Sequence, residues 1–351
     1  MAEGDPQGSA FHRLRVCEVV AETPDARSIM FTVPSESAQH FDYRPGQFLT
    51  LRIPSDRTGS VARCYSLSSS PHTDDRLQVT VKRTADGYGS NWVCDNIRAG
   101  MNVEVLPPAG LFTPKSLNAD LLLFAGGSGI TPVMSIVKSA LAEGDGKITL
   151  VYANRDERSV IFAEALQRLT EKTPERLTVI HWLETVQGLP TVPMLRAIAV
   201  PFAERDAFIC GPAAFRDAVK LALRELGFRR DRLHIEKFVS LARNPFETGN
   251  VPTAAAGTDE LDAAVEVTLD GRTASYRWPR QQKLLDLLLE QGLDAPFSCR
   301  EGQCSACACR VEVGEVRMLH NEVLEEEDLT DNIRLACQSV PVTDRIKISY
   351  D

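Results

Sequence analysis

Four cysteines near the C-terminus constrain the fold of this 351-residue chain more than any other feature. Four residues separate Cys299 from Cys304, two separate Cys304 from Cys307, and Cys337 follows after 29 more. In a reducing compartment such crowding indicates metal ligation before disulfides. The thiols can converge only if a short loop wraps its backbone closely around the bound group, which small side chains allow. The small residues in and beside this loop are Gly302, Ser305, Ala306 and Ala308.

The spacing matches that of plant-type [2Fe-2S] clusters, in which four thiolates hold two iron ions. Zinc is the main alternative, although structural zinc sites usually use two C-x2-C-like pairs. Unligated structural cysteines are a second alternative, and we interpret a fifth thiol, Cys309, as a packing residue. Residues from about Val265 to Asp351 resemble a plant-type ferredoxin domain, which implies an α+β β-grasp fold and transfer of one electron at a time.

The composition indicates a soluble globular protein of several domains. Apolar residues make up 43% and charged residues 25% of the chain, and its length exceeds one ordinary core, so we expect three domains. No apolar run approaches the roughly 20 residues of a membrane span, and the N-terminus lacks a basic region followed by an apolar stretch. We therefore expect no membrane partner and a cytoplasmic location.

Negative charge is concentrated in the last segment. Residues 258–351 hold 19 acidic and 10 basic residues, whereas the rest of the chain holds 29 of each. This distribution argues against a nucleic-acid partner and suits a domain that docks on a basic protein surface. The acidic residues could equally serve only to keep the segment soluble.

Hydrophobic patterns divide the chain into four stretches. Residues 11–115 show short alternating runs broken by Pro and Gly, which is typical of antiparallel strands in a small β-barrel. Residues 118–238 alternate apolar runs with helical stretches, which predicts an α/β domain with helices on both faces of a parallel sheet. Residues 239–262 have few large apolar groups and are interpreted as a linker. Residues 263–351 open with two alternating runs around an Asp-Gly pair, a strong hairpin signal, followed by one helix.

Within the barrel region, Arg63, Tyr65 and Ser66 form an R-x-Y-S motif. On a strand, Arg63 and Tyr65 share a face. The motif resembles that of the ferredoxin-NADP reductase superfamily. The resemblance implies that the guanidinium meets the FAD pyrophosphate, that the phenol packs on the isoalloxazine and that the serine bonds near flavin N5. An exposed arginine beside a core tyrosine is the structural alternative.

A second segment resembles another flavin-binding part of the same superfamily. A strand ends near Lys82, and a Gly-rich segment follows it. Glycines there would let backbone N–H groups approach the pyrophosphate closely. The residues that the resemblance assigns to cofactor binding in this segment are Lys82, Gly87, Gly89 and Ser90.

The apolar run at residues 121–125 leads directly into GGSGITP and then into a helix. The third glycine of a dinucleotide fingerprint is absent, and Pro132 stands there instead, suited to a first helical turn. The segment resembles the G-x-G-x-T-P loop of the reductase superfamily, which implies that it holds the nicotinamide nucleotide's pyrophosphate at a helix N-terminus. The loop residues are Gly126, Gly127, Ser128, Gly129, Thr131 and Pro132.

A later strand ends in Cys210, Gly211 and Pro212, which match the superfamily's C-G-P signature. The resemblance places Cys210 near the nicotinamide C4. It also places Glu236 and Phe238 near the flavin and nicotinamide rings. The structural alternatives are a buried strand cysteine, a charged strand end and a packing phenylalanine. The residues to which we assign catalytic roles are Tyr65, Ser66, Cys210 and Glu236.

The preference between NADH and NADPH depends on the residues after the second parallel strand, where this fold meets the adenosine ribose. Arg155 could bind the 2′-phosphate of NADPH, but Asp156 and Glu157 beside it would repel one. We therefore expect NADH as the electron donor.

The order flavin domain, nucleotide domain, ferredoxin domain is typical of reductase components of multicomponent oxygenases, a class that includes phenylacetyl-CoA epoxidase reductases. The passages SGITPVMSIVKSALAEG and LDAPFSCREGQC resemble more closely the reductases that serve hydroxylases of 3-ketosteroids. This resemblance implies an electron-transfer enzyme with FAD and a [2Fe-2S] cluster, a Rieske-type non-haem iron oxygenase as partner, and a role in steroid degradation. The alternatives are a reductase of a phenylacetyl-CoA epoxidase-like or other oxygenase, and a redox-sensing protein that does not turn over NADH.

Overall fold

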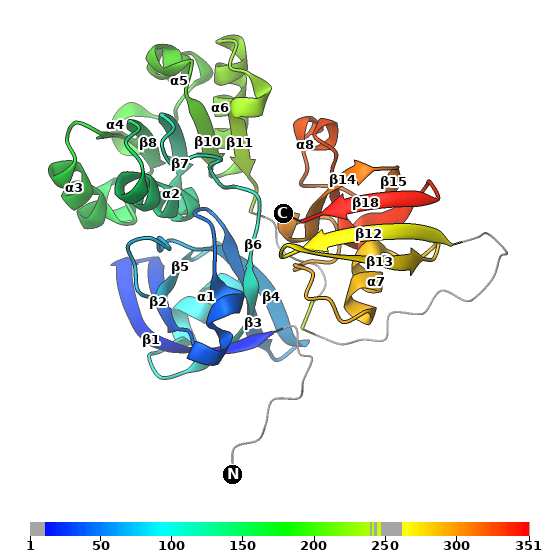
Figure 1. The fold of residues 1–351 in the computed structure, drawn as a ribbon. Coiled ribbons are helices and arrows are strands. Elements are labelled where there is room, and N and C mark those ends of the chain that lie inside the picture. The colour runs from blue at the N-terminus through cyan, green and yellow to red at the C-terminus, as the bar shows by residue number, and fades with distance from the viewer. Residues whose placement is uncertain (1–10, 239–240, 242–243, 247–261, 351) are drawn as a thin grey trace.

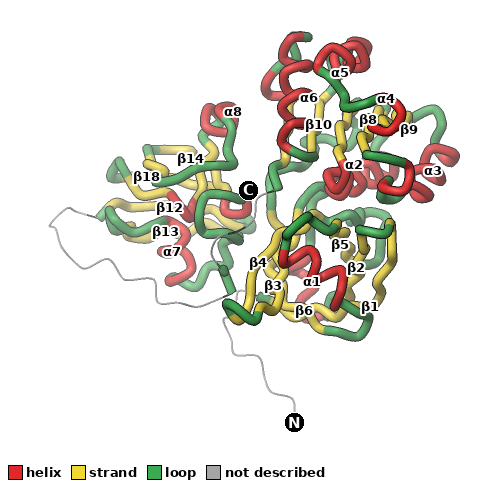
Figure 2. The backbone as a smooth tube through the Cα atoms, turned by 180° about the vertical axis from the view of Figure 1, so that it is seen from behind, coloured by secondary structure: helices red, strands yellow, loops and turns green. Residues whose placement is uncertain are grey.

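The computed structural model describes residues 11–238, 241, 244–246 and 262–350, which form three units (Figures 1 and 2). In Figure 1 the first unit runs from blue to cyan, the second is green and the third runs from yellow to red. Most of the stretch 239–262, which we interpret as a linker, lies outside the described residues. Among the described residues, every helix is too short or too polar to traverse a membrane.

The first unit is an antiparallel β-barrel, as predicted. Its elements are β1 (His12–Thr23), β2 (Ala26–Thr32), the 3-10 helix η1 (Ser35–Phe41), β3 (Phe48–Ser55), β4 (Gly59–Ser66), β5 (Leu77–Lys82), α1 (Tyr88–Asn96) and β6 (Asn102–Ala109). The strands pair in the order β4-β3-β6-β1-β2-β5, and a bridge between Leu67 and Val79 joins the two edges of the sheet. Because successive strand residues point to opposite faces, alternate side chains such as Leu49 and Leu51 fill the interior.

The second unit has the predicted parallel sheet, with strand order β11-β10-β7-β8-β9. Its strands are β7 (Leu121–Gly126), β8 (Ile148–Asn154), β9 (Leu177–Leu183), β10 (Asp206–Cys210) and β11 (Leu233–Glu236). Its helices are η2 (Gly127–Gly129), α2 (Ile130–Glu143), η3 (Glu157–Ser159), α3 (Ala163–Lys172), α4 (Glu184–Gln187), α5 (Val192–Ala199), η4 (Val200–Phe202), α6 (Ala213–Glu225) and η5 (Arg230–Arg232). The short helix α5 is not predicted from the sequence pattern, and β11 is anticipated only through the alternative that Glu236 is a charged strand end.

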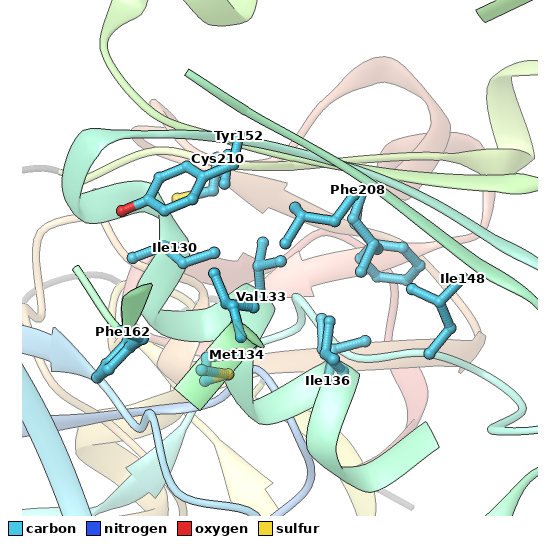
Figure 3. Packing of buried hydrophobic residues seen from close by; sticks show 14 of the residues in the cluster. Ile130, Val133, Met134, Ile136, Ile148, Tyr152, Phe162, Phe208 and Cys210 are labelled. Atoms are coloured by element: carbon cyan, nitrogen blue, oxygen red, sulfur yellow. The ribbon is translucent and has the colours of Figure 1, made fainter. Parts of the chain in front are cut away.

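Helices cover both faces of this sheet. Leu123 of β7 belongs to the core under α2, whereas its neighbour Phe124 belongs to the core under α6. Figure 3 shows the first of these cores, where Ile130 and Val133 of α2 pack with Phe208 of β10. Burial on both faces explains why these strands are continuous apolar runs rather than alternating ones.

The third unit is the α+β β-grasp fold predicted for the C-terminal segment. Its main sheet has the order β13-β12-β18-β14-β16, and β15 pairs with β17. Its elements are β12 (Ala263–Leu269), β13 (Arg272–Trp278), α7 (Leu284–Glu290), η6 (Ser305–Cys307), β14 (Ala308–Val313), β15 (Val316–Met318), α8 (Glu326–Thr330), β16 (Ile333–Leu335), η7 (Ala336–Gln338), β17 (Ser339–Pro341) and β18 (Arg345–Ser349). Asp270 and Gly271 both have positive φ, as the predicted two-residue hairpin turn requires.

Candidate functional site

The four predicted metal ligands meet at one end of the third unit, and all are buried. The thiol of Cys299 contacts those of Cys304 and Cys337, and Cys337 in turn contacts Cys307. In the described residues, no group of three or more His, Cys, Asp or Glu side chains surrounds a position for one metal ion. The four sulfur atoms instead form a continuous chain of contacts.

Backbone N–H groups point at these sulfur atoms. The amides of Glu301 and Gln303 each lie 3.3 Å from the Cys299 sulfur, and the Cys337 amide lies 3.4 Å from the Cys307 sulfur. Hydrogen bonds from the Cys304 and Cys337 thiols lower the pKa of Cys299. Four buried sulfurs with N–H donors around them fit the ligand set of a [2Fe-2S] cluster.

The loop backbone takes conformations that the sequence anticipates only in part. Gly302 has a φ of +79°, and a Cβ at this position would lie 2.8 Å from the His320 carbonyl oxygen, so the position excludes larger residues. Arg300 also has a positive φ; its carbonyl accepts a hydrogen bond from Gln338, 2.9 Å away. Cys309 lies in the core of the unit and donates to the Arg334 carbonyl.

The R-x-Y-S residues lie on β4. The guanidinium of Arg63 donates to the Ala62 carbonyl at 2.7 Å, and Ser66 is buried at the end of the strand. Burial raises the pKa of Tyr65, and within the described residues its buried hydroxyl has no hydrogen-bond partner. An unsatisfied buried hydroxyl costs about 1–3 kcal/mol. The hydroxyl therefore fits contact with a group outside the chain, as FAD would be.

The second flavin segment forms the start of α1, a helix that the sequence pattern does not predict. Gly87 is the residue before the helix, and a Cβ on Gly89 would lie 2.9 Å from the Arg63 Cγ. The Ser90 hydroxyl accepts a hydrogen bond from the Thr84 amide at 3.0 Å. Because the first N–H groups of a helix have no partner within it, this N-terminus next to Arg63 can hold a phosphate.

The glycine loop between β7 and α2 packs on the C-G-P segment after β10. A Cβ on Gly129 would lie 2.2 Å from the Cys210 carbonyl oxygen, and one on Gly211 would lie 3.0 Å from the Gly126 Cα. Gly127 takes a left-handed φ of +52°. The structure thus brings two separately predicted motifs together, and only glycine permits the approach.

The rest of this loop completes the start of α2. The Thr131 hydroxyl donates to the Ser128 carbonyl at 3.0 Å, and Pro132 lies buried in the first turn, while Pro212 precedes α6. The ammonium of Lys82, expected at the flavin, lies 3.8 Å from the position of a Cβ on Gly127. A positive charge from the barrel therefore stands beside the nucleotide loop.

Cys210 and Glu236 are paired neighbours at the ends of β10 and β11. Burial raises the pKa of both side chains, and for Glu236 the pKa reaches about 7, although the Lys237 amide and Arg216 lower it. A carboxyl group with this pKa can hold or release a proton near neutral pH. Phe238 follows and is 47% exposed.

Arg155 follows β8, and its guanidinium lies 3.5 Å from the carboxylate of Asp25 in the turn between β1 and β2. Asp25 also lies 3.8 Å from the Lys82 ammonium. The side chain of Asp156 accepts a hydrogen bond from the Ser159 amide and caps η3. The acid that faces Arg155 therefore comes from another unit, and no sequence pattern near Arg155 reveals it.

One pocket joins residues of all three units. Four predicted residues share it: Ser66 of the barrel, Glu236 and Phe238 at the end of the nucleotide unit, and Cys304 of the cysteine loop. The full lining is Phe48, Cys64, Ser66, Glu236, Lys237, Phe238, Gln303 and Cys304.

The cysteine loop is held against β4 by contacts that the sequence does not reveal. The Ser298 hydroxyl lies 2.8 Å from the Thr50 hydroxyl and 3.5 Å from the Cys64 sulfur, and the Leu111 amide donates to the Ser305 hydroxyl at 3.3 Å. Among the residues of this contact, Cys64 lies within a predicted flavin-binding motif, as the variable position of R-x-Y-S. The flavin strand and the cluster loop are thus direct neighbours.

Three domain families match the chain in the order of the three units. The oxidoreductase FAD-binding domain matches residues 13–113, the oxidoreductase NAD-binding domain matches residues 123–220, and the 2Fe-2S iron-sulfur cluster binding domain matches residues 267–342. The chain therefore binds FAD, a nicotinamide adenine dinucleotide and a [2Fe-2S] cluster.

Full-length relatives share this organisation. The chain is 60% identical over 350 residues to the 3-ketosteroid-9-alpha-monooxygenase ferredoxin reductase component of Mycolicibacterium smegmatis, with 99% of each chain covered. It is 34% identical over 368 residues to one of the subunits of the 1,2-phenylacetyl-CoA epoxidase of Escherichia coli, with 98% of each covered. The solved structure of a phthalate dioxygenase reductase has the same fold, with a TM-score of 0.56, 23% identity, and coverage of 97% of this chain and 98% of that one.

The fold and the three cofactor domains define the class as a modular oxidoreductase that carries FAD, NAD and [2Fe-2S] sites in one chain. Sequence identity to relatives over nearly the whole chain identifies the family within this class. The chain belongs to the family of ferredoxin reductase components of 3-ketosteroid-9-alpha-monooxygenases. The predicted family, fold class and cofactors are confirmed.

Proposed function

We propose that the chain carries electrons from NADH through FAD and the [2Fe-2S] cluster to a Rieske-type oxygenase that hydroxylates a 3-ketosteroid in steroid degradation. The observation that carries this proposal is the pocket shared by Ser66, Glu236 and Cys304, one from each unit. A flavin strand, a nucleotide strand end and a cluster loop that meet at one space favour transfer within a single chain. The relative at 60% identity supports the steroid system.

We assign each cofactor to groups that the geometry favours. Arg63 and the N–H groups at the start of α1 bind the FAD pyrophosphate, and Tyr65 and Ser66 bind its ring. The loop at residues 126–132, at the N-terminus of α2, binds the pyrophosphate of the nicotinamide nucleotide. FAD held by these groups would supply the chemistry that converts a two-electron hydride from NADH into single electrons for the cluster. Glu236 lines the pocket shared by the three units and can hold or release a proton there near neutral pH.

The proposed cluster ligands are the four thiolates of Cys299, Cys304, Cys307 and Cys337. The N–H groups around them stabilise the negative charge of the sulfur atoms and so tune the reduction potential. The match to a 2Fe-2S binding domain over residues 267–342 favours iron over the zinc alternative.

The proposed preference for NADH depends on Asp25. Its carboxylate lies 3.5 Å from the Arg155 guanidinium and so partly neutralises the group that would bind a 2′-phosphate. A 2′-phosphate would also meet the negative charge of Asp25 itself. Because the Arg155 side chain is 68% exposed, we expect a modest contribution from the pair.

The partner type and the location are parts of the same proposal. The net negative charge of residues 258–351 supports a basic docking surface on the oxygenase. The described residues include all nine cysteines and no disulfide between them, which supports a reducing compartment, and we propose the cytoplasm.

The proposed function is tested by reconstitution with purified oxygenases. NADH-dependent hydroxylation of a 3-ketosteroid by its Rieske-type oxygenase is the expected result. If product formed only with phenylacetyl-CoA and its epoxidase, the chain would be the reductase of that epoxidase and the steroid assignment would be wrong. If NADH bound but failed to bleach the flavin or to reduce an artificial acceptor, the chain would be a redox-sensing protein instead.

A further inference from the structure

The third unit makes a charged contact with the second beside the pocket that Gln303 and Cys304 of the cysteine loop line with Lys237. Glu325, just before α8, lies 3.1 Å from the Lys220 ammonium on α6 and 2.7 Å from the Lys237 ammonium after β11. The next residue, Glu326, lies 3.0 Å from the Arg230 guanidinium. Acidic residues of the ferredoxin unit therefore pair with basic residues of this same chain.

Glu325 is the more enclosed of the two carboxylates. Its side chain is 30% exposed, against 80% for Glu326. Although burial raises the pKa of Glu325, the ammonium groups of Lys237 and Lys220 lower it below the ordinary value for glutamate. One carboxylate shared by two half-buried ammonium groups forms a small network, and networks contribute more than isolated surface pairs.

The other contact of the ferredoxin unit is uncharged. Ser298 meets Thr50 of β3, and Cys299 and Cys304 share an apolar cluster with Phe48 of β3. Figures 1 and 2 both place the third unit on the β3–β4 side of the barrel, with α8 toward the second unit. These hydroxyl and apolar contacts join the unit to the barrel, whereas the ion pairs of Glu325 join it to the nucleotide unit.

We propose that Glu325 is a positioning residue whose ion pairs with Lys220 and Lys237 hold the ferredoxin unit on the nucleotide unit, so that the cluster loop stays against the flavin strand β4. This inference rests on the proposed function, because it concerns transfer from flavin to cluster. Glu325 does not line the pocket shared by the three units, and it acts through Lys237, which does, and through the orientation of its unit. Part of the acidic surface that could meet an oxygenase is thereby used within the chain.

The test uses the holoprotein and the variant Glu325→Lys, which replaces two attractions by two repulsions. By small-angle scattering we expect a larger radius of gyration than in the wild type. After mixing with NADH, we expect the flavin to bleach at the wild-type rate, whereas the cluster is reduced at least about tenfold more slowly, which is the scale of a lost ion-pair network.

The matched control is Glu312→Lys, the same charge change on a ferredoxin-unit glutamate whose ion-pair partner, Lys347, lies 3.9 Å away in that same unit. We expect this control to match the wild type in both measurements. Adding Lys220→Glu to Glu325→Lys restores one attraction and should recover part of the lost rate.

A wild-type radius and a wild-type rate of cluster reduction in Glu325→Lys would overturn the proposal. If that variant does not fold, the wild type is measured at increasing salt concentration. The radius of gyration should rise and the rate of cluster reduction should fall as salt screens the ion pairs. If neither quantity changed with salt, the proposal would be wrong. Failure of the proposed function has a different signature, because then the wild-type cluster is not reduced by NADH at all.

Discussion

The cluster loop and the proposed binding site for flavin and nicotinamide, which we call the cleft, are assembled in opposite ways. All four proposed cluster ligands come from residues 299–337 of one unit, around a loop whose amides serve the sulfurs. The cleft takes its groups from β4 and α1 of the barrel and from loops after β7, β10 and β11 of the nucleotide unit. A substitution in the cluster loop should therefore remove one cofactor, the cluster. A substitution in the cleft should instead slow electron transfer between the nicotinamide nucleotide and the flavin.

The largest expected effect is that of Cys304→Ser in the local site. Removal of one thiolate should abolish the cluster and its visible absorption, because a buried hydroxyl is a poor substitute for a thiolate ligand. The flavin should remain bound and should still bleach with NADH. Absorption spectroscopy checks both points, and a visible spectrum identical to that of the wild type would refute the ligand assignment.

Gly129→Ala should slow electron transfer from NADH to the flavin and leave the cluster intact. The added Cβ would lie 2.2 Å from the Cys210 carbonyl oxygen, so the nucleotide loop must shift. A displacement of this kind is expected to slow flavin reduction by NADH about a hundredfold, as measured by stopped-flow absorption. In the control Gly188→Ala the Cβ meets no atom within 4 Å, although the left-handed φ of +71° strains the backbone locally, so stability should fall while flavin reduction stays normal. Normal flavin reduction in Gly129→Ala would contradict the packing of the two motifs.

Tyr65→Phe should have a smaller effect on the barrel side of the cleft. Because the hydroxyl is buried without a partner in the described residues, its removal should stabilise the flavin-free protein while weakening FAD binding about fivefold to tenfold. Titration calorimetry and thermal unfolding measure the two quantities. In the control Tyr43→Phe, which removes a bond to Ser69 of 2.8 Å, stability should fall and FAD affinity should not change. Unaltered FAD affinity in Tyr65→Phe would show that the hydroxyl does not meet the flavin.

The smallest expected effect is that of Asp25→Asn, which links the cleft to nucleotide choice. Without the carboxylate, Arg155 should accept a 2′-phosphate more readily, and the KM for NADPH should fall about twofold to fivefold while that for NADH changes little. Steady-state kinetics with both nucleotides measure the change. This decrease in the KM for NADPH should vanish when Arg155→Gln is added. If the decrease persisted in the double variant, a group other than Arg155 would bind the 2′-phosphate.

The contrast between a local site and a shared cleft also explains which features of the structure the sequence predicts. The cluster ligands and the hairpin at Asp270 and Gly271 are predictable because their signals are local, in spacing and in turn chemistry. Gly129 and Gly211 are predictable because close backbone approach excludes side chains at these positions.

What escapes prediction joins residues far apart in the chain. Ser298 meets Thr50, Glu325 meets Lys220, and Arg155 meets Asp25, each pair coming from different units. No local period or motif encodes such a pairing, because the partner is set by how the units pack. The helix α1 is missed for another reason: Gly87 and Gly89 favour a loop by propensity, but its position over β3 and β5 makes it helical in context.

The most direct test follows both chromophores after the wild-type holoprotein is mixed with NADH in the absence of oxygen and oxygenase. Transfer from the cleft to the local site requires the flavin band to bleach first and the cluster band to follow in a second phase. If the flavin bleached while the cluster stayed oxidised, the chain would not carry electrons from its nucleotide end to its cluster, and the proposed electron path would be wrong.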